Sequence, residues 1–233
     1  MYNPKSLKAE EFICHREVLD TLAYADANRN NPQLVDQVLN KARERKGLNH
    51  REAMILLDCD IPEKNREIFE LAEQIKKDYY GNRIVMFAPL YLSNYCVNGC
   101  VYCPYHAKNK HIPRRKLTQE EVAREVVALQ DMGHKRLAIE AGEDPVNNPI
   151  EYILECIRTI YGIKHKNGAI RRVNVNIAAT TVENYRKLKD AGIGTYILFQ
   201  ETYHKESYEK LHPTGPKPVS YTHLRAHETP EHL

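Results

Sequence analysis

The chain has 233 residues, of which 42% are hydrophobic and 28% charged, and these proportions predict a globular protein with a sizeable core. The formal net charge is +3, with positive and negative residues interspersed, so we expect no nucleic-acid partner. The sequence begins without an apolar signal segment, and no stretch approaches the ~20 apolar residues of a membrane span. We therefore expect a cytoplasmic protein with no membrane partner.

The first part of the chain, from about residue 6 to residue 80, has a helical pattern. Apolar residues recur there at spacings of three and four within polar segments, as at Ile68, Leu71 and Ile75. We expect residues 1–80 to form a helical N-terminal extension.

From residue 81 the pattern changes to alternating strands and helices. The apolar run IVMFAPLYLSNYC predicts a buried strand that begins near Arg83. A capping box of Thr118 and Glu121 begins a helix, which Gly133 ends. A strand is expected next, over residues 136–140.

A second helix is expected to start at Asn148 and Pro149, and the strictly alternating segment RRVNVNIA after it predicts a strand with two different faces. Its apolar residues (Val173, Val175 and Ile177) should face outer helices, whereas Asn174 and Asn176 should point into a polar interior. A helix over VENYRKLKDAG and a strand over TYILFQE complete the pattern.

This alternation predicts an α/β fold with a parallel sheet, of the (β/α) TIM-barrel type. Four strands are expected, which correspond to about the first four of the eight βα units in a closed barrel. They are expected to begin near Arg83, Arg136, Arg172 and Thr195. We expect residues 81–218 to be this N-terminal half-barrel.

The last residues, 219–233, have no period and a concentration of histidine. We expect a non-native tail, because the segment resembles a translated sequencing adapter, and a metal site at His223, His227 and His232 is disfavoured without a folded context. On this interpretation the authentic sequence ends near Pro218 and the chain is truncated.

Three of the six cysteines, Cys96, Cys100 and Cys103, fall within eight residues directly after the first expected strand. The arrangement CVNGCVYC is C-x3-C-x2-C, with Gly99 expected to allow the tight wrap, and it predicts a metal site. The other three cysteines (Cys14, Cys59 and Cys156) lie in helix-like segments, where buried apolar roles are expected.

Three thiolates leave one iron of a 4Fe-4S cluster open to an exogenous ligand, such as the amino and carboxylate groups of S-adenosylmethionine (SAM). Two other interpretations of the cysteines are weaker. A zinc site would need His106 as its fourth ligand and would lack the second knuckle usual in zinc ribbons. A redox CxxC pair would leave Cys96 without a role.

The spacing C-x3-C-x-aromatic-C, with Tyr102 in the aromatic position, resembles the signature of the radical SAM superfamily. The resemblance implies that the backbone of Tyr102 contacts the SAM adenine. The resemblance implies a 4Fe-4S cluster and SAM as cofactors. A match to the family's G-G-E motif occurs at Ala141, Gly142 and Glu143, with alanine in place of the first glycine. In the family the backbone carbonyls of this motif receive the SAM ammonium group. Further SAM contacts are implied at Gln200-Glu201-Thr202-Tyr203, where relatives bind the ribose; Glu201 is the candidate, with a solvated surface glutamate as the alternative.

Longer segments, including IEAGEDPVNNPIEYI and FQETYHKESYEKLHPTGPK, resemble the aromatic amino acid lyase branch over residues 1–218, and most closely the tyrosine lyases of FeFe-hydrogenase maturation. The resemblance implies cleavage of the tyrosine Cα–Cβ bond to p-cresol and dehydroglycine, the precursor of CO and cyanide. It also implies L-tyrosine, an electron donor and other hydrogenase maturation proteins as partners. Cysteines for the family's auxiliary cluster have no counterpart here, and no catalytic residue is assigned.

Two alternatives stay open. One is a 2-iminoacetate synthase of the thiamine pathway, which stops at dehydroglycine, and the other is a non-catalytic zinc-binding module. Because four βα units leave an open sheet edge, we expect residues 1–233 alone to be poorly soluble and not to cleave tyrosine.

Overall fold

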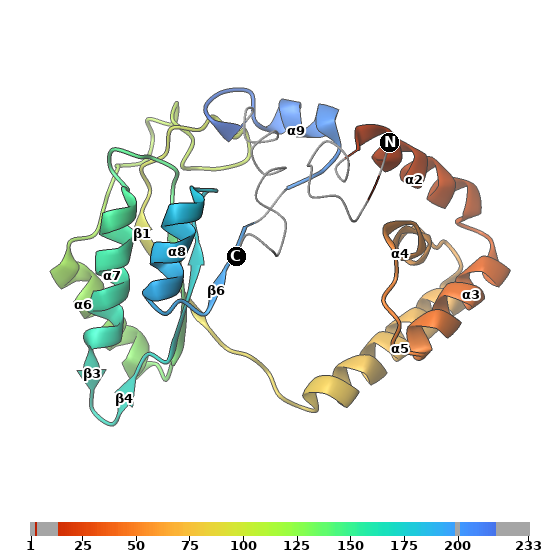
Figure 1. Ribbon diagram of the computed structural model, residues 1–233, viewed down its shortest axis with the longest axis horizontal. Coiled ribbons are helices and arrows are strands. Elements are labelled where there is room, and N and C mark those ends of the chain that lie inside the picture. The colour runs from red at the N-terminus through yellow and green to blue at the C-terminus, as the bar shows by residue number, and fades with distance from the viewer. Residues whose placement is uncertain (1–2, 4–13, 199–200, 218–233) are drawn as a thin grey trace. The chain divides into compact units, whose positions relative to one another are not determined.

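The computed structural model describes residues 3, 14–198 and 201–217 (Figure 1). The described residues divide into two compact units, one of residues 14–85 and one of residues 86–217 together with Asn3. No helix in these residues is long and apolar enough to cross a membrane.

The first unit consists of four helices. Asparagine side chains cap two of them: Asn31 accepts a hydrogen bond from the Leu34 amide, and Asn49 forms a capping box with Glu52. Apolar side chains from three of the helices, together with Cys59, form its core, in agreement with the helical pattern predicted here. The helices are α2 (His15–Asn28), α3 (Pro32–Arg43), α4 (His50–Leu57) and α5 (Pro62–Tyr80).

The second unit is built on a four-stranded parallel sheet in the order β1-β2-β5-β6, which confirms the predicted α/β class. Its strands are β1 (Ala88–Ser93), β2 (Arg136–Ala141), β5 (Arg172–Asn176) and β6 (Thr195–Tyr196). Its helices are α6 (Gln119–Asp131), α7 (Ile150–Gly162), α8 (Val182–Asp190) and α9 (Lys205–Leu211). A short antiparallel hairpin, β3 (Lys164–His165) with β4 (Gly168–Ala169), was not expected from the sequence.

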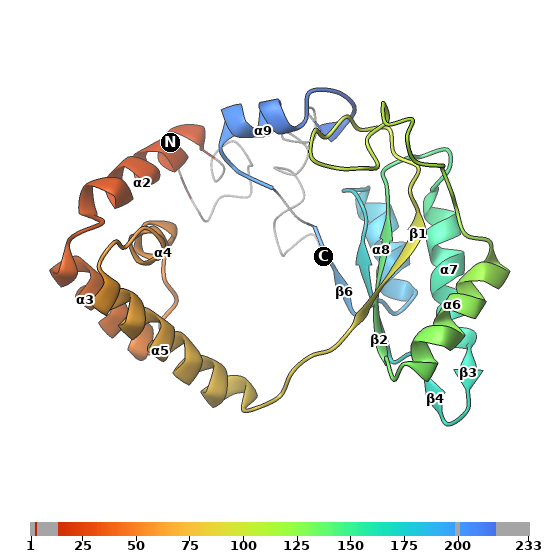
Figure 2. The same cartoon turned by 180° about the vertical axis from the view of Figure 1, so that it is seen from behind.

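One face of the sheet packs against α6, α7 and α8, which Figure 2 shows from behind the view of Figure 1. Val173 and Val175 of β5 are fully buried in this core, as the alternating pattern predicted. The opposite face is more open, and Tyr91 of β1 is 51% exposed there. The sheet therefore has an apolar helix-covered side and a polar side.

Two helix boundaries follow the capping chemistry. Thr118 and Glu121 form the predicted capping box, and Gly133 ends α6 with a φ of +93°, a conformation that favours glycine. Pro149 is the N-cap of α7, one residue before the first helical position, so the second helix starts slightly later than expected.

The first strand also begins later than predicted, at Ala88 and not near Arg83. Its pairing partner β2 starts at Arg136 and Ala88 pairs with Leu137, so the preceding residues have no strand beside them. Their side chains, Ile84–Phe87, are 54–83% exposed. The apolar composition of this run was therefore misleading as a sign of burial.

The fourth strand contains Thr195 and Tyr196 in place of the longer predicted segment, part of which lies outside the described residues. Residues 218–233 also lie outside them, so the predicted tail at 219–233 stays a prediction.

Candidate cluster and cofactor site

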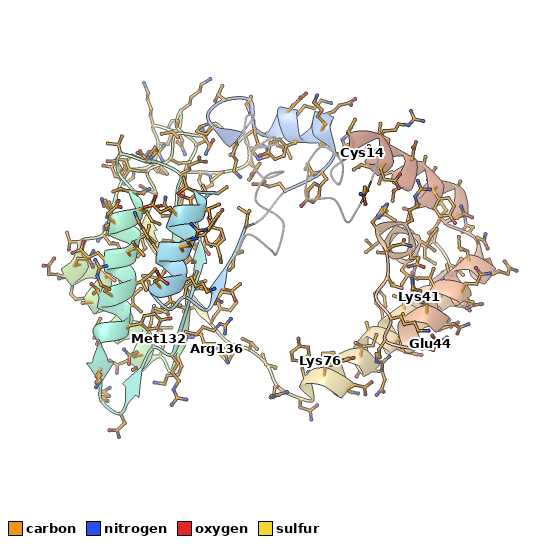
Figure 3. The ribbon with its side chains drawn as sticks, in the orientation of Figure 1. Cys14, Lys41, Glu44, Lys76, Met132 and Arg136 are labelled. Atoms are coloured by element: carbon orange, nitrogen blue, oxygen red, sulfur yellow. The ribbon has the colours of Figure 1, made fainter. Side chains whose placement is uncertain are left out.

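The three clustered cysteines lie on the loop that leaves the carboxyl end of β1. Cys100 is 6% exposed, whereas Cys96 and Cys103 are half-buried. All three line one pocket of about 350 Å³, within the size range of small-molecule sites. Arg136, labelled in Figure 3, is the first residue of β2, so the pocket lies at the other end of the sheet.

The remaining cysteines are separate from this loop. Cys14 lies at the start of α2 in the first unit (Figure 3), and Cys59 is buried in the core of that unit. Cys156 is fully buried on α7. The predicted buried apolar role is confirmed for Cys59 and Cys156, while Cys14 is half-buried.

Carboxyl ends of the neighbouring strands supply the rest of the pocket lining. Ala141 ends β2 and is followed by Gly142 and Glu143, and Asn176 ends β5. Because the strands are parallel, these segments meet the cysteine loop at one edge of the sheet, which is where α/β folds bind ligands.

Gly142 permits a close approach between the loops after β1 and β2. A Cβ at this position would lie 2.3 Å from the Tyr95 carbonyl oxygen and 2.9 Å from Cys96 Cβ. The carbonyl oxygens of Gly142 and Glu143 accept hydrogen bonds from Asn148 Nδ2 and the Val97 amide. Each retains a second lone pair.

Gly99 has a similar role, for a reason other than the predicted tight wrap. Its φ is not in the left-handed region, but a Cβ there would lie 2.0 Å from the Thr214 hydroxyl. The Gly99 amide donates to the Thr214 carbonyl at 2.8 Å, and the Val101 amide donates to the Leu211 carbonyl at 3.0 Å. The segment after α9 therefore packs directly on the cysteine loop.

Asn98 links three segments of the site, and sequence reasoning missed it. Its side chain is 2% exposed; Nδ2 donates to Glu143 Oε2 at 2.6 Å and Oδ1 accepts from the Lys217 amide at 2.9 Å. Its own carbonyl accepts from the Ala107 amide at 2.7 Å. A single asparagine inside the cysteine motif carries no signal that predicts such a role.

Glu201 lies in the pocket with a cationic partner. Its Oε1 accepts hydrogen bonds from the Tyr102 hydroxyl and from Lys217 Nζ, the latter at 2.5 Å. Burial opposes ionisation of the carboxyl, but the bonds from Lys217 and Tyr102 outweigh it and hold its pKa below the ordinary value. Glu201 is therefore a half-buried carboxylate with bonded partners and not the solvated surface residue of the alternative interpretation.

The Tyr102 hydroxyl also lies 2.9 Å from Nε2 of His212, whose side chain is fully buried. Burial and the neighbouring Glu201 carboxylate raise the pKa of Tyr102, so the hydroxyl keeps its proton and acts as a donor. Lys217 and His212 occur in the segment LHPTGPK, whose role was not assigned from the sequence.

Two buried acceptor atoms in the pocket lining have no hydrogen-bond partner in the described part of the chain. They are Glu201 Oε2 and Asn176 Oδ1. Buried acceptors without partners are uncommon in folded proteins, and a ligand that carries hydroxyl groups would satisfy them. Of the six residues expected to contact SAM, only Tyr203 does not line the pocket, and it is 39% exposed; the five that line it are Tyr102, Ala141, Gly142, Glu143 and Glu201.

The cysteine set fits an iron–sulfur cluster better than a single ion. Burial raises the pKa of the Cys100 thiol, and Lys217 and Tyr102 offset this only in part, so the positive charge of bound iron would favour the thiolate there. Among the described residues, no group of three His, Cys, Asp or Glu side chains converges well enough to hold one metal ion. In a cubane cluster each thiolate binds its own iron, so convergence on one point is not required.

The sequence profile of the radical SAM superfamily matches residues 90–228, more than half of the chain, and the chain therefore belongs to that superfamily. Members of this family are enzymes that use a 4Fe-4S cluster and SAM.

Solved structures of FeFe-hydrogenase maturases resemble the chain closely. A crystal structure of HydG, a maturase of the [FeFe]-hydrogenase, is 54% identical in sequence and superimposes with a TM-score of 0.87. The matched region is 94% of this chain and 48% of the HydG chain. HydG from Carboxydothermus hydrogenoformans is 38% identical with a TM-score of 0.79, covering 94% and 51%. These likenesses confirm the predicted family resemblance and fold.

Among curated proteins, 2-iminoacetate synthase from Salmonella typhimurium is 29% identical over 199 residues, which are 85% of this chain and 49% of that protein. The chain thus spans about half the length of the relatives it matches.

Proposed function

We propose that this chain supplies the cluster- and SAM-binding part of a tyrosine lyase that acts in FeFe-hydrogenase maturation. The observation that carries the proposal is the pocket at the carboxyl edge of the sheet, in which Cys96, Cys100 and Cys103 meet the segment after β2. The 54% identity to HydG over 94% of the chain supports the specific activity.

In the proposed site the three cysteine thiolates hold a 4Fe-4S cluster, and SAM binds beside it. When bound, the pair supplies a carbon radical by one-electron cleavage of a C–S bond of SAM. With tyrosine as substrate, the proposed reaction would break the Cα–Cβ bond to give p-cresol and dehydroglycine.

The chain's own residues bind and orient the cofactors. Asn98 holds the cysteine loop to Glu143, which lies where the SAM methionine group is expected. Glu201, kept ionised by Lys217, and Asn176 offer buried acceptors, which suits the ribose hydroxyls. The apolar packing beneath the sheet keeps this end of the strands rigid.

The activity is tested with the product of the gene's complete reading frame, supplied with tyrosine, SAM and dithionite under anaerobic conditions. We expect p-cresol, measured by chromatography, from the wild type and none from Cys100→Ala. A wild-type protein that is loaded with its cluster and cleaves SAM but releases no p-cresol would exclude tyrosine as the substrate.

A second candidate is a 2-iminoacetate synthase, favoured by the 29% identity to the Salmonella typhimurium enzyme. Both activities release p-cresol, and they differ in the fate of dehydroglycine. Trapping of CO by deoxyhaemoglobin in the same assay separates them, since CO is expected for the hydrogenase maturation activity alone.

A further inference from the structure

The segment that surrounds the cysteines carries positive charge without any acidic residue. Between residues 86 and 119 there is no aspartate or glutamate, while five lysines and arginines occur within residues 108–116. The whole chain has a net charge of only +3, so the rest of it has a small excess of acidic residues. Positive and negative residues are interspersed in the rest of the chain, but beside the cysteine loop only positive residues occur.

Three of the five cations are used within the fold. Arg114 donates to four backbone carbonyls, Arg115 pairs with Glu121 at 2.8 Å, and Lys116 Nζ lies 4.0 Å from the centre of the Tyr152 ring. Lys108 and Lys110 differ from these, since both are exposed and form no ion pair within the described part of the chain. Their charges are available to a partner.

These two lysines are joined closely to the cysteine loop. The Ala107 amide donates to the Asn98 carbonyl at 2.7 Å, and the His106 amide donates to the Cys103 carbonyl at 3.2 Å. Val101, between Cys100 and Cys103, is 63% exposed. An exposed apolar side chain within the cysteine motif, with two exposed lysines five and seven residues after Cys103, has the composition of a protein interface with a charged rim.

We propose that the Lys108–Lys110 surface docks an acidic one-electron carrier protein that reduces the cluster. This inference rests on the proposed function, because it assumes a cluster on Cys96, Cys100 and Cys103. One electron leaves the carrier and enters the cluster, and no bond forms or breaks in that transfer. Positive charge at the rim speeds association with an acidic partner and makes the association sensitive to salt.

The test uses the cluster-loaded chain and a plant-type 2Fe-2S ferredoxin, an acidic low-potential carrier, as the probe. Isothermal titration calorimetry gives the dissociation constant at low and high salt for the wild type and for the double variant Lys108→Glu/Lys110→Glu. Charge reversal should weaken ferredoxin binding about tenfold at low salt and remove most of the salt dependence. The rate of cluster reduction by ferredoxin should fall in parallel, while reduction by dithionite stays within about twofold of the wild type.

Lys164→Glu/Lys189→Glu is the charge-matched control, because both lysines are also exposed but lie at the start of β3 and near the end of α8. It should bind ferredoxin like the wild type. Equal ferredoxin affinity in the wild type and the double variant, or equal loss in the control, would overturn the inference and leave the proposed function intact. A chain that takes up no iron overturns the proposed function, and with it this inference.

Discussion

Arg114 stabilises the loop between the cysteines and α6 through its guanidinium group. It donates to the carbonyls of Asn94, Tyr105, His106 and Asn109 at 2.6–3.3 Å, and so connects the start of the loop with the segment after Cys103. A planar group with several donors can bridge diverging carbonyls in a way that a single ammonium cannot. This loop has few buried apolar side chains, so these bonds hold its shape.

Arg114→Lys should therefore weaken cluster retention, because an ammonium has three donors and leaves at least one of the four carbonyls without a partner. We expect the half-life of the cluster in the presence of an iron chelator to shorten about tenfold, measured by the loss of absorbance near 400 nm. Arg115→Lys, at an exposed neighbour whose partner is Glu121, is the control and should retain its cluster. Equal half-lives in the wild type and Arg114→Lys would rule out this role.

Glu201→Gln keeps the size of the side chain and removes its charge. Its carboxylate accepts from Lys217, and its second oxygen is buried in the pocket with no hydrogen-bond partner among the described residues. We therefore expect SAM affinity to fall about tenfold with unchanged iron content. Equilibrium dialysis with labelled SAM measures the effect. Glu209→Gln, at an exposed position on α9, should bind SAM normally. Unchanged SAM affinity in Glu201→Gln would show that the ribose assignment is wrong.

Helix α6 begins directly after the basic segment, and its capping box fixes where the loop ends. The Thr118 hydroxyl accepts from the Glu121 amide at 3.2 Å, and Glu121 Oε2 accepts from the Thr118 amide at 2.8 Å. Thr118→Ala should lower the free energy of unfolding by about 1 kcal/mol in urea denaturation, whereas Thr118→Ser keeps the cap and should change it little. No difference between the two variants would contradict the capping role.

In the first unit, Glu17 on α2 joins that helix to α4. It accepts from Arg51 Nε at 2.7 Å and lies 2.9 Å from His50 Nε2. The bond from Arg51, followed by that from His50, lowers the pKa of Glu17 from 4.5 to about 2. A lowered carboxyl pKa stabilises the fold above the unfolded value of 4.5, and this stabilisation is lost as pH falls towards 2.

Glu17→Gln should accordingly lower the Tm at pH 7, and its difference from the wild type should narrow as pH falls below 4.5. Thermal unfolding followed by circular dichroism between pH 7 and pH 3 measures this. Glu63→Gln, at an exposed position 3.6 Å from Arg66, should have no effect. A Tm difference that stays constant with pH would contradict the assigned cause.

Features of the whole molecule that depend on local patterns could be predicted from the sequence. The periodicity of β5, the caps of α6 and the spacing of the cysteines each depend on neighbouring residues, and they predicted the fold class and the position of the site. Contacts across many residues could not be predicted. The bond from Lys217 to Glu201 and the packing of Thr214 on Gly99 depend on where the segment after α9 folds back.

At residues 84–87 the local pattern gave a wrong prediction. Composition alone predicts burial for Ile84–Phe87, but burial of a strand also requires a neighbour to pair with, and β2 begins too late to supply one. Pairing partners are a property of the whole sheet, and a single segment does not encode them.

The most direct test of the account is the iron and sulfide content of the anaerobically reconstituted chain, measured together with the electron paramagnetic resonance spectrum after reduction. We predict about four irons per wild-type chain, as one 4Fe-4S cluster requires, and loss of that cluster in Cys100→Ala with no loss in Cys156→Ala. A normal cluster in Cys100→Ala, or a colourless wild-type chain that binds one zinc ion, would contradict the central claim.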